Sequence, residues 1–116
     1  MRPDEQNDII DAAIRILLEG DRCITVGFSP DGISIRFPTT RKLAEFLGIP
    51  HYYVLPRFGE MERDGLIRRE ERVGISTTPA GTQRLLSIMA ERYSERAEEV
   101  LGRDIFAVLR QRAGIC

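Results

Sequence analysis

A turn of three residues between two short helical segments is the feature that most constrains how this chain can fold. Residues 40–47 carry inward-facing apolar side chains at helical spacing, and the hydroxyl of Thr39 can accept a hydrogen bond from an amide of their first turn. Gly48 ends this segment, and residues 49–50 lead directly into a second segment at residues 51–64. Two helices joined this tightly are typical of a helix-turn-helix.

The chain after this motif predicts a small hairpin followed by helices. Two extended runs, residues 66–71 and 75–77, surround Val73 and Gly74. Thr78 can cap the next helix, and Pro79 suits its first position because a missing amide costs nothing there. Apolar residues then keep steps of three and four as far as Gly102, which breaks or bends the helix before a last helix that ends near Arg112. The apolar positions of the long helix are Leu85, Met89, Tyr93, Ala97 and Val100.

The chain before the motif predicts one helix and a further hairpin. Residues 4–19 place apolar side chains on an unusually wide stripe, and Gly20 supplies a stop. Such a stripe covers a core on one side and a partner subunit on the other, or it belongs to one deeply buried helix; the spacing leaves both open. Two alternating runs then flank residues 29–32, whose proline and glycine favour a type I turn. We expect this hairpin to be architectural.

From Thr39 to Leu86 the order of these signals resembles the winged helix-turn-helix module of MarR-type transcriptional regulators. The residues that carry the resemblance are Thr39, Leu43, Ala44, Leu47, Gly48, Ile49, Val54, Phe58, Met61, residues 65–69, residues 78–81 and Leu85. It implies one mainly α domain with a little β structure (α+β) over residues 1–116. Within it we expect an N-terminal helix at 1–20, the extra hairpin at 22–38, the helix-turn-helix and wing at 39–78, and C-terminal helices at 79–112.

The resemblance also implies which residues meet duplex DNA. The start of the second helix supplies base contacts in this family, the helix before it contacts phosphate, and the wing reaches the backbone. The base contacts fall on His51, Tyr52, Tyr53 and Arg57, the phosphate contacts on Thr40, Arg41 and Lys42, and the wing contacts on Arg69 and Arg72. The alternative for the two tyrosines is that they only pack on the domain surface or in the core and do not contact DNA.

Pro56 is a departure from the family pattern inside the second helix. An interior proline removes a backbone hydrogen bond and clashes with the previous turn, at roughly 3 kcal/mol, and Gly59 weakens the helix further. Either the helix is kinked there, or an irregular turn covers residues 50–55 and the helix begins at Pro56. We prefer the second interpretation, which makes Arg57 the stronger base-contact candidate and the tyrosines weaker ones.

Apolar residues outside the compact module predict a twofold homodimer held by the terminal helices. The predicted interface residues are Ile9, Ile16, Ile105, Phe106, Val108 and Leu109. The alternative is that they fold back on the core of the same chain. In the dimer, two recognition segments would face one duplex, so the expected site is an inverted repeat.

Net charge and the length of the apolar runs limit the partners and the location that we expect for this protein. The net charge of −1 does not by itself predict a nucleic-acid partner, and the acidic residues 1–20 should face away from DNA. No apolar run reaches the roughly 20 residues of a membrane span, and no signal peptide is visible, so we expect a cytoplasmic protein.

Side-chain chemistry predicts neither catalysis nor a bound cofactor. Cys23, Cys116 and His51 are too scattered to bind a metal, and we expect a buried strand thiol at Cys23 and a tail residue at Cys116. The sequence contains no nucleophile elbow, no phosphate-binding loop and no carboxylate pair beside a histidine, so we do not expect an enzyme. The function expected is sequence-specific DNA binding, with an effector that the sequence does not identify. The alternative is a winged-helix module that docks on another protein.

Overall fold

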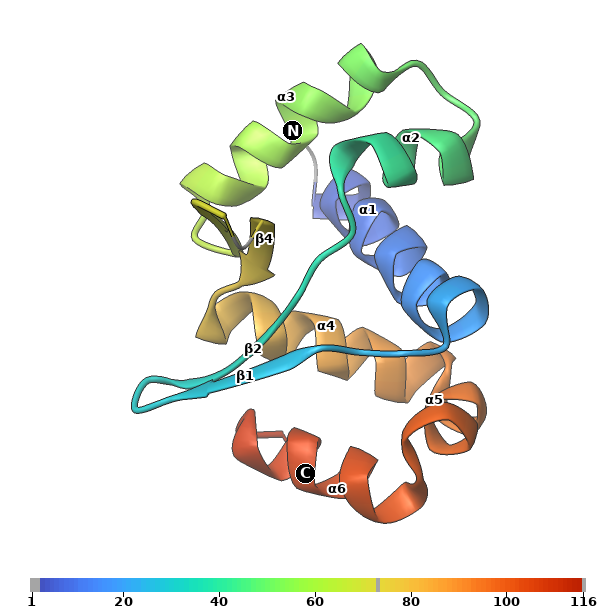
Figure 1. The fold of residues 1–116 in the computed structure, drawn as a ribbon, viewed down its shortest axis with the longest axis vertical. Helices are drawn as coiled ribbons and strands as arrows, with labels where there is room; N and C mark the ends of the chain where they lie inside the picture. The colour runs from blue at the N-terminus through green and yellow to red at the C-terminus, as the bar shows by residue number, and fades with distance from the viewer. Residues whose placement is uncertain (1–2, 73, 116) are drawn as a thin grey trace.

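Helices alternate with two antiparallel hairpins in the computed structural model, which describes residues 3–72 and 74–115 (Figure 1). The elements in chain order are α1 (Pro3–Arg15), η1 (Ile16–Asp21), β1 (Val26–Ser29), β2 (Gly32–Ile35), α2 (Thr40–Leu47), α3 (His51–Arg63), β3 (Ile67–Glu70), β4 (Gly74–Thr77), α4 (Pro79–Arg92), α5 (Ser94–Leu101) and α6 (Arg103–Arg112). The predicted class, mainly α with a little β, is confirmed. None of the helices in these residues is long and apolar enough to cross a membrane.

The N-terminal helix is buried on a wide face by its own chain. α1 packs against α2, α3 and α4, and eight apolar residues between Ile9 and Leu18 belong to the core. The deeply buried interpretation of the apolar stripe is therefore the one that the structure supports. The predicted stop at Gly20 is wrong, because the helix continues as the π-helical η1 and ends where Arg22 adopts a left-handed φ of 51° and its amide bonds the carbonyl of Leu17.

The two hairpins lie edge to edge through a short connection. In the first, Ser29 pairs with Gly32 around a two-residue turn, and Gly32 takes a φ of 134° that favours glycine. An isolated bridge between Arg36 and Ser76 then joins this hairpin to β4 of the second. Both predicted hairpins are confirmed, except that Val73 of the second lies outside the described residues. Cys23 is exposed before β1, so the expectation of a buried thiol is wrong; Cys116 lies outside the described residues.

α2 has the predicted bounds and the predicted caps. The Thr39 hydroxyl accepts the Lys42 amide at 3.1 Å, and Gly48 ends the helix at a φ of 67°. Leu43 and Ala44 are buried against α1 and α3, as their spacing predicts. The turn that follows delivers the chain into α3 at His51.

α3 runs without interruption through Pro56, so the prediction that the helix begins at this proline is wrong. Val54, Phe58 and Met61 are fully buried on the inner face, whereas Pro56 lies on the exposed outer face. Full burial of one large apolar side chain contributes about 1.5–3 kcal/mol, so three of them outweigh the roughly 3 kcal/mol cost of an interior proline. Tertiary packing therefore overrides the local preference.

The long C-terminal helix is broken at a residue that carries no breaker signal. α4 ends and α5 begins around Tyr93, whose φ of −133° and ψ of 28° are not helical. The prediction of one helix from Pro79 to Gly102 is therefore wrong. The break turns α5 towards η1. The predicted break at Gly102 is confirmed by its φ of 88°.

Most of the predicted dimer residues are buried inside the single chain. Ile9 is 0% exposed, Ile16 6%, Phe106 1% and Leu109 4%. The expectation that these four lie outside the compact module is wrong, because α1, η1 and α6 all pack on the core of the same chain. Ile105 and Val108 remain exposed on the outer side of α6.

Candidate nucleic-acid interface

α3 has one face open to solvent and a neighbouring element beside each end. α2 packs along it near His51, and the hairpin β3–β4 lies beside its other end (Figure 1). Because Val54, Phe58 and Met61 face inward, the outer face carries Tyr52, Pro56 and Arg63. This is the surface that the sequence assigns to DNA.

The start of α2 lies next to the start of α3. The Thr40 hydroxyl and the Nε2 of His51 are 2.7 Å apart, so these two predicted site residues bond each other across the turn. Lys42 is exposed, but its Nζ lies 2.8 Å from Asp21 Oδ1. Arg41 is exposed and makes no ion pair with the described residues. Arg41 is therefore the cation of α2 most available to an anionic partner.

Tyr52 and Tyr53 lie on the surface in the first turn of α3. Their side chains are 66% and 55% exposed, and their ring centroids are 4.7 Å apart at an interplanar angle of 34°. Neither side chain is packed in the core. Two exposed aromatic rings with hydroxyls at a helix start offer both apolar area and hydrogen-bonding groups to a partner.

Arg57 does not lie where the prediction required it. Because α3 begins at His51, Arg57 is in mid-helix directly before the buried Phe58, which turns it towards α1. It is half-buried beside a hollow that Asp8, Asp11 and Arg15 also line. The expectation that it is the best base contact rested on a helix starting at Pro56, and that start is wrong.

The second hairpin carries arginines on an arm and at its turn. Arg69 Nε is 3.5 Å from Glu62 on α3, and Arg68 Nε is 3.1 Å from Glu70. Arg72 is exposed at the turn with a φ of 70°, and among the described residues it makes no ion pair. Of the predicted wing contacts, Arg72 is the freer cation.

Sequence reasoning missed two exposed apolar side chains next to this surface. Phe46 on α2 is 40% exposed and has Arg15 over its ring at 5.0 Å, and Leu55 on α3 is 41% exposed. Leu55 falls off the spacing of Val54, Phe58 and Met61, and that offset is the signal that predicts its exposure.

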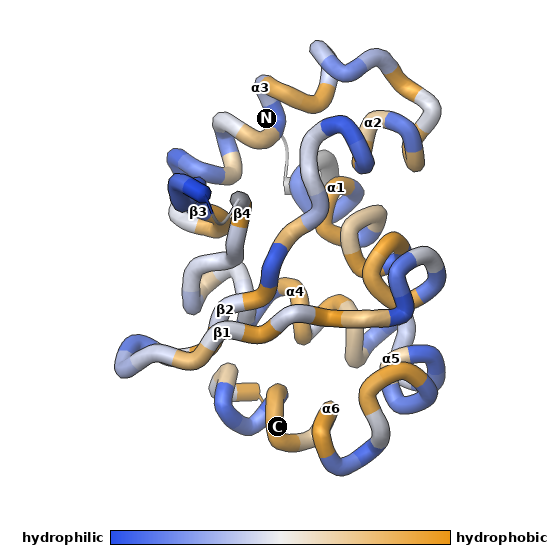
Figure 2. Tube along the Cα trace, in the orientation of Figure 1, coloured by the Kyte–Doolittle hydropathy of each residue, from blue (hydrophilic) through white to orange (hydrophobic). Residues whose placement is uncertain are grey.

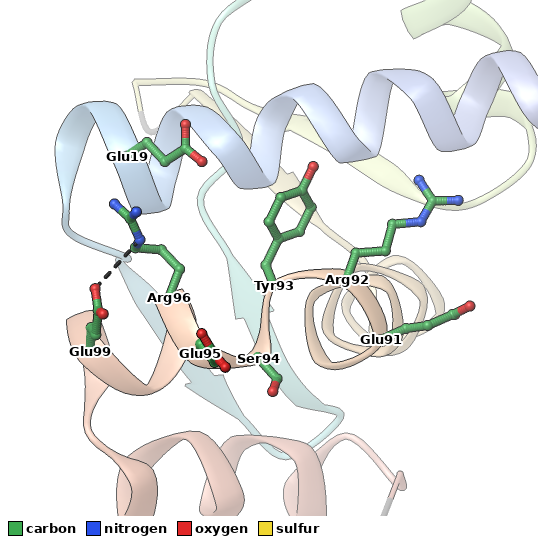
Figure 3. Close-up of a pocket in the computed structure, with 8 residues that line it drawn as sticks. All are labelled: Glu19, Glu91, Arg92, Tyr93, Ser94, Glu95, Arg96 and Glu99. Carbon is green, nitrogen blue, oxygen red and sulfur yellow. Dashed lines mark ion pairs between the residues drawn. The ribbon is translucent and has the colours of Figure 1, made fainter.

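A polar hollow lies at the break between α4 and α5, away from this surface (Figure 3). Its lining residues are Glu19, Glu91, Arg92, Tyr93, Ser94, Glu95, Arg96 and Glu99. The Tyr93 hydroxyl donates to both oxygens of Asp11, at 2.9 and 3.0 Å, and Arg92 contacts the same carboxylate. Burial and then this hydrogen bond raise the pKa of Tyr93. These contacts hold the end of α4 against α1. We therefore assign the residues around this hollow a structural role and not a ligand-binding one.

Comparison with protein families, curated proteins and solved structures finds no match to this chain. Within the described residues, no group of three or more histidine, cysteine or carboxylate side chains is arranged to hold a metal ion.

Proposed function

We propose that this chain is a winged helix-turn-helix protein of the MarR-like type that binds duplex DNA and regulates transcription. In this proposal α2 and α3 are the helix-turn-helix, and β3–β4 is the wing. An α-helix fits the major groove, and a two-stranded wing beside it reaches the backbone or the minor groove. The arrangement of α3 between α2 and the hairpin supports this assignment.

One observation carries the proposal: α3 exposes two tyrosines at its start, and the element beside each of its ends carries an arginine that makes no ion pair with the described residues. Tyr52 and Tyr53 project from the first turn of α3, Arg41 from α2, and Arg72 from the turn of the hairpin. In a complex, the two arginines would contact phosphate and fix the orientation, while the tyrosines would meet base edges. The wing is short, so its contact would be with the backbone.

A homodimer is part of the proposal, since an isologous pair reads an inverted repeat with two recognition helices. The terminal helices leave only Ile105 and Val108 of the six predicted interface residues exposed. A stable dimer therefore needs further surface.

The test is a titration of a fluorescent duplex of random sequence with the full chain at several salt concentrations. Phosphate contacts release counterions, so the logarithm of affinity should fall linearly with the logarithm of salt. Arg41→Ala and Arg72→Ala should each reduce that slope by about 1. Arg103→Ala is the matched control, because its side chain is 85% exposed on α6, outside the proposed site. Absence of binding at low salt, or an equal effect of the control, would overturn the proposal.

A second candidate function is docking on another protein through the same surface. The exposed side chains of Phe46, Tyr52, Tyr53 and Leu55 favour it, because aromatic residues are enriched at protein interfaces. The same titration separates the two functions, because a docking module gives no salt-dependent binding of DNA and Arg41→Ala or Arg72→Ala then changes no DNA affinity.

A further inference from the structure

β1 is an edge strand with one side unpaired. It pairs with β2, which is the only described element that packs extensively along it. The Arg36 amide bonds the carbonyl of Thr25, and the ladder register makes Gly27 and Ser29 the next residues that bond β2. Hydrogen-bonded and non-bonded pairs alternate in antiparallel sheets, so the amides and carbonyls of Val26 and Phe28 face the open edge.

This edge lacks the protection that the other hairpin has. β3 carries Arg68, Arg69 and Glu70, and charged residues are the usual means of preventing edge pairing. β1 reads Val-Gly-Phe-Ser and contains no charge. Phe28 is 67% exposed, the most exposed of the large apolar side chains. In Figure 2 the hairpin strands carry hydrophobic segments, and the turn between them is hydrophilic.

We propose that the open edge of β1 pairs antiparallel with β1 of a second copy of this chain. With Gly27 on the twofold axis, Val26 of one copy lies opposite Phe28 of the other. Their outward amides and carbonyls then bond across the axis, and each exposed phenylalanine packs on a valine of the partner. This contact rests on the homodimer in the proposed function and does not require DNA binding.

The charges at the two ends of the edge favour a second copy in this orientation. Arg22 precedes the strand and Asp31 follows it, and both are exposed and make no ion pair with the described residues. Antiparallel pairing about Gly27 brings the turn of one copy, which carries Asp31, towards the segment of the other copy that precedes β1 and carries Arg22, and it does so twice. Parallel pairing would instead place like charges together. The two ends of the edge therefore carry opposite charges that an antiparallel pair brings together.

Further exposed apolar surface lies on α6, an element that adjoins the same hairpin. α6 packs on β2, so its exposed Ile105 and Val108 lie on an element adjoining the same hairpin (Figure 1). A pair of short strands alone falls below the roughly 1,000 Å² of a specific stable interface. We therefore expect a dimer that forms reversibly with concentration.

Sedimentation equilibrium of the full chain without DNA tests the proposal. We expect a monomer–dimer equilibrium that Phe28→Glu weakens by at least about tenfold, because it removes a central apolar contact and adds like charges at the axis. Tyr52→Glu is the matched control: Tyr52 is 66% exposed on α3, so its replacement should leave the equilibrium unchanged. Circular dichroism checks that both variants keep their helix content.

A charge exchange tests the orientation independently. Arg22→Asp and Asp31→Arg should each weaken the dimer by bringing like charges towards each other at its two ends, and the double variant should restore it. A mass of 13.2 kDa at every concentration would overturn the proposal, and so would a dimer that Phe28→Glu leaves intact. Neither outcome bears on DNA binding, which the duplex titration measures separately.

Discussion

Gly81 in the first turn of α4 lies directly against the backbone of Leu66, at the start of the second hairpin. A Cβ at position 81 would be 1.8 Å from the Leu66 carbonyl oxygen, and that atom belongs to the main chain and cannot rotate away. The Thr78 amide bonds the same carbonyl at 3.0 Å, which closes the base of the hairpin onto the helix. This contact fixes the position of the hairpin relative to α4.

We predict that Gly81→Ala lowers the free energy of unfolding by about 3 kcal/mol, the upper part of the range for overpacking a close contact. Urea denaturation followed by circular dichroism measures the change. Gly20→Ala is the control, because no atom lies within 4 Å of a Cβ at that position and its φ is not in the left-handed region. If both variants unfold at the wild-type midpoint, the contact is not as close as described.

A buried hydroxyl pair joins the two hairpins to α4, and we predict that Thr77→Val breaks it. Thr77 Oγ1 accepts the Ile35 amide at 2.8 Å and lies 2.7 Å from the Thr82 hydroxyl. Valine has nearly the same shape but leaves that amide buried without an acceptor, which should cost about 1–3 kcal/mol. The urea midpoint should fall while the slope stays constant. Thr25→Val, at an exposed position, should leave the midpoint close to wild type.

Several caps of this fold, though not the end of η1, were predictable because their chemistry is local. Thr39, Gly48 and Pro79 each act within a few residues of their own position, and each was assigned correctly from the sequence. The break at Tyr93 has no such signal. It coincides with a hydrogen bond to Asp11, which is 82 residues away in the chain, and no local pattern reveals such a partner.

The candidate site was predictable in part for the same reason. The exposed positions of Tyr52, Tyr53 and Arg72 follow from where their elements begin and turn. The preference for Arg57 depended on a helix that starts at Pro56, and that start is wrong; Arg57 lies in mid-helix and is half-buried beside α1. Burial of Phe106 depends on α6 folding back on the core, which helical periodicity alone does not specify.

The hydrogen bond from Tyr93 to Asp11 should contribute to stability in a pH-dependent way. Tyr93→Phe removes a bond to a partly exposed carboxylate and should cost about 1–2 kcal/mol at neutral pH. The folded protein raises the pKa of Tyr93 above 10.0, chiefly through burial, so its contribution is complete below the unfolded pKa and is lost as the pH rises through the folded value. Urea midpoints of the two proteins should therefore converge above pH 10. A difference between the two urea midpoints that stays the same from neutral pH to above pH 10 would contradict the prediction.

Pro56 is tolerated in α3 because the inner face is buried, so relieving it should stabilise the protein. Pro56→Ala restores an amide that can bond the Tyr52 carbonyl and removes the clash with the previous turn, a gain of roughly 3 kcal/mol. Alanine also makes the unfolded chain more flexible, which offsets about 0.4–1 kcal/mol of it. The net increase in unfolding free energy should be about 2 kcal/mol by urea denaturation. Pro79→Ala is the control, since proline is favourable at the first position of α4, and it should give no gain. A destabilised Pro56→Ala variant would mean that the proline ring itself supports α3.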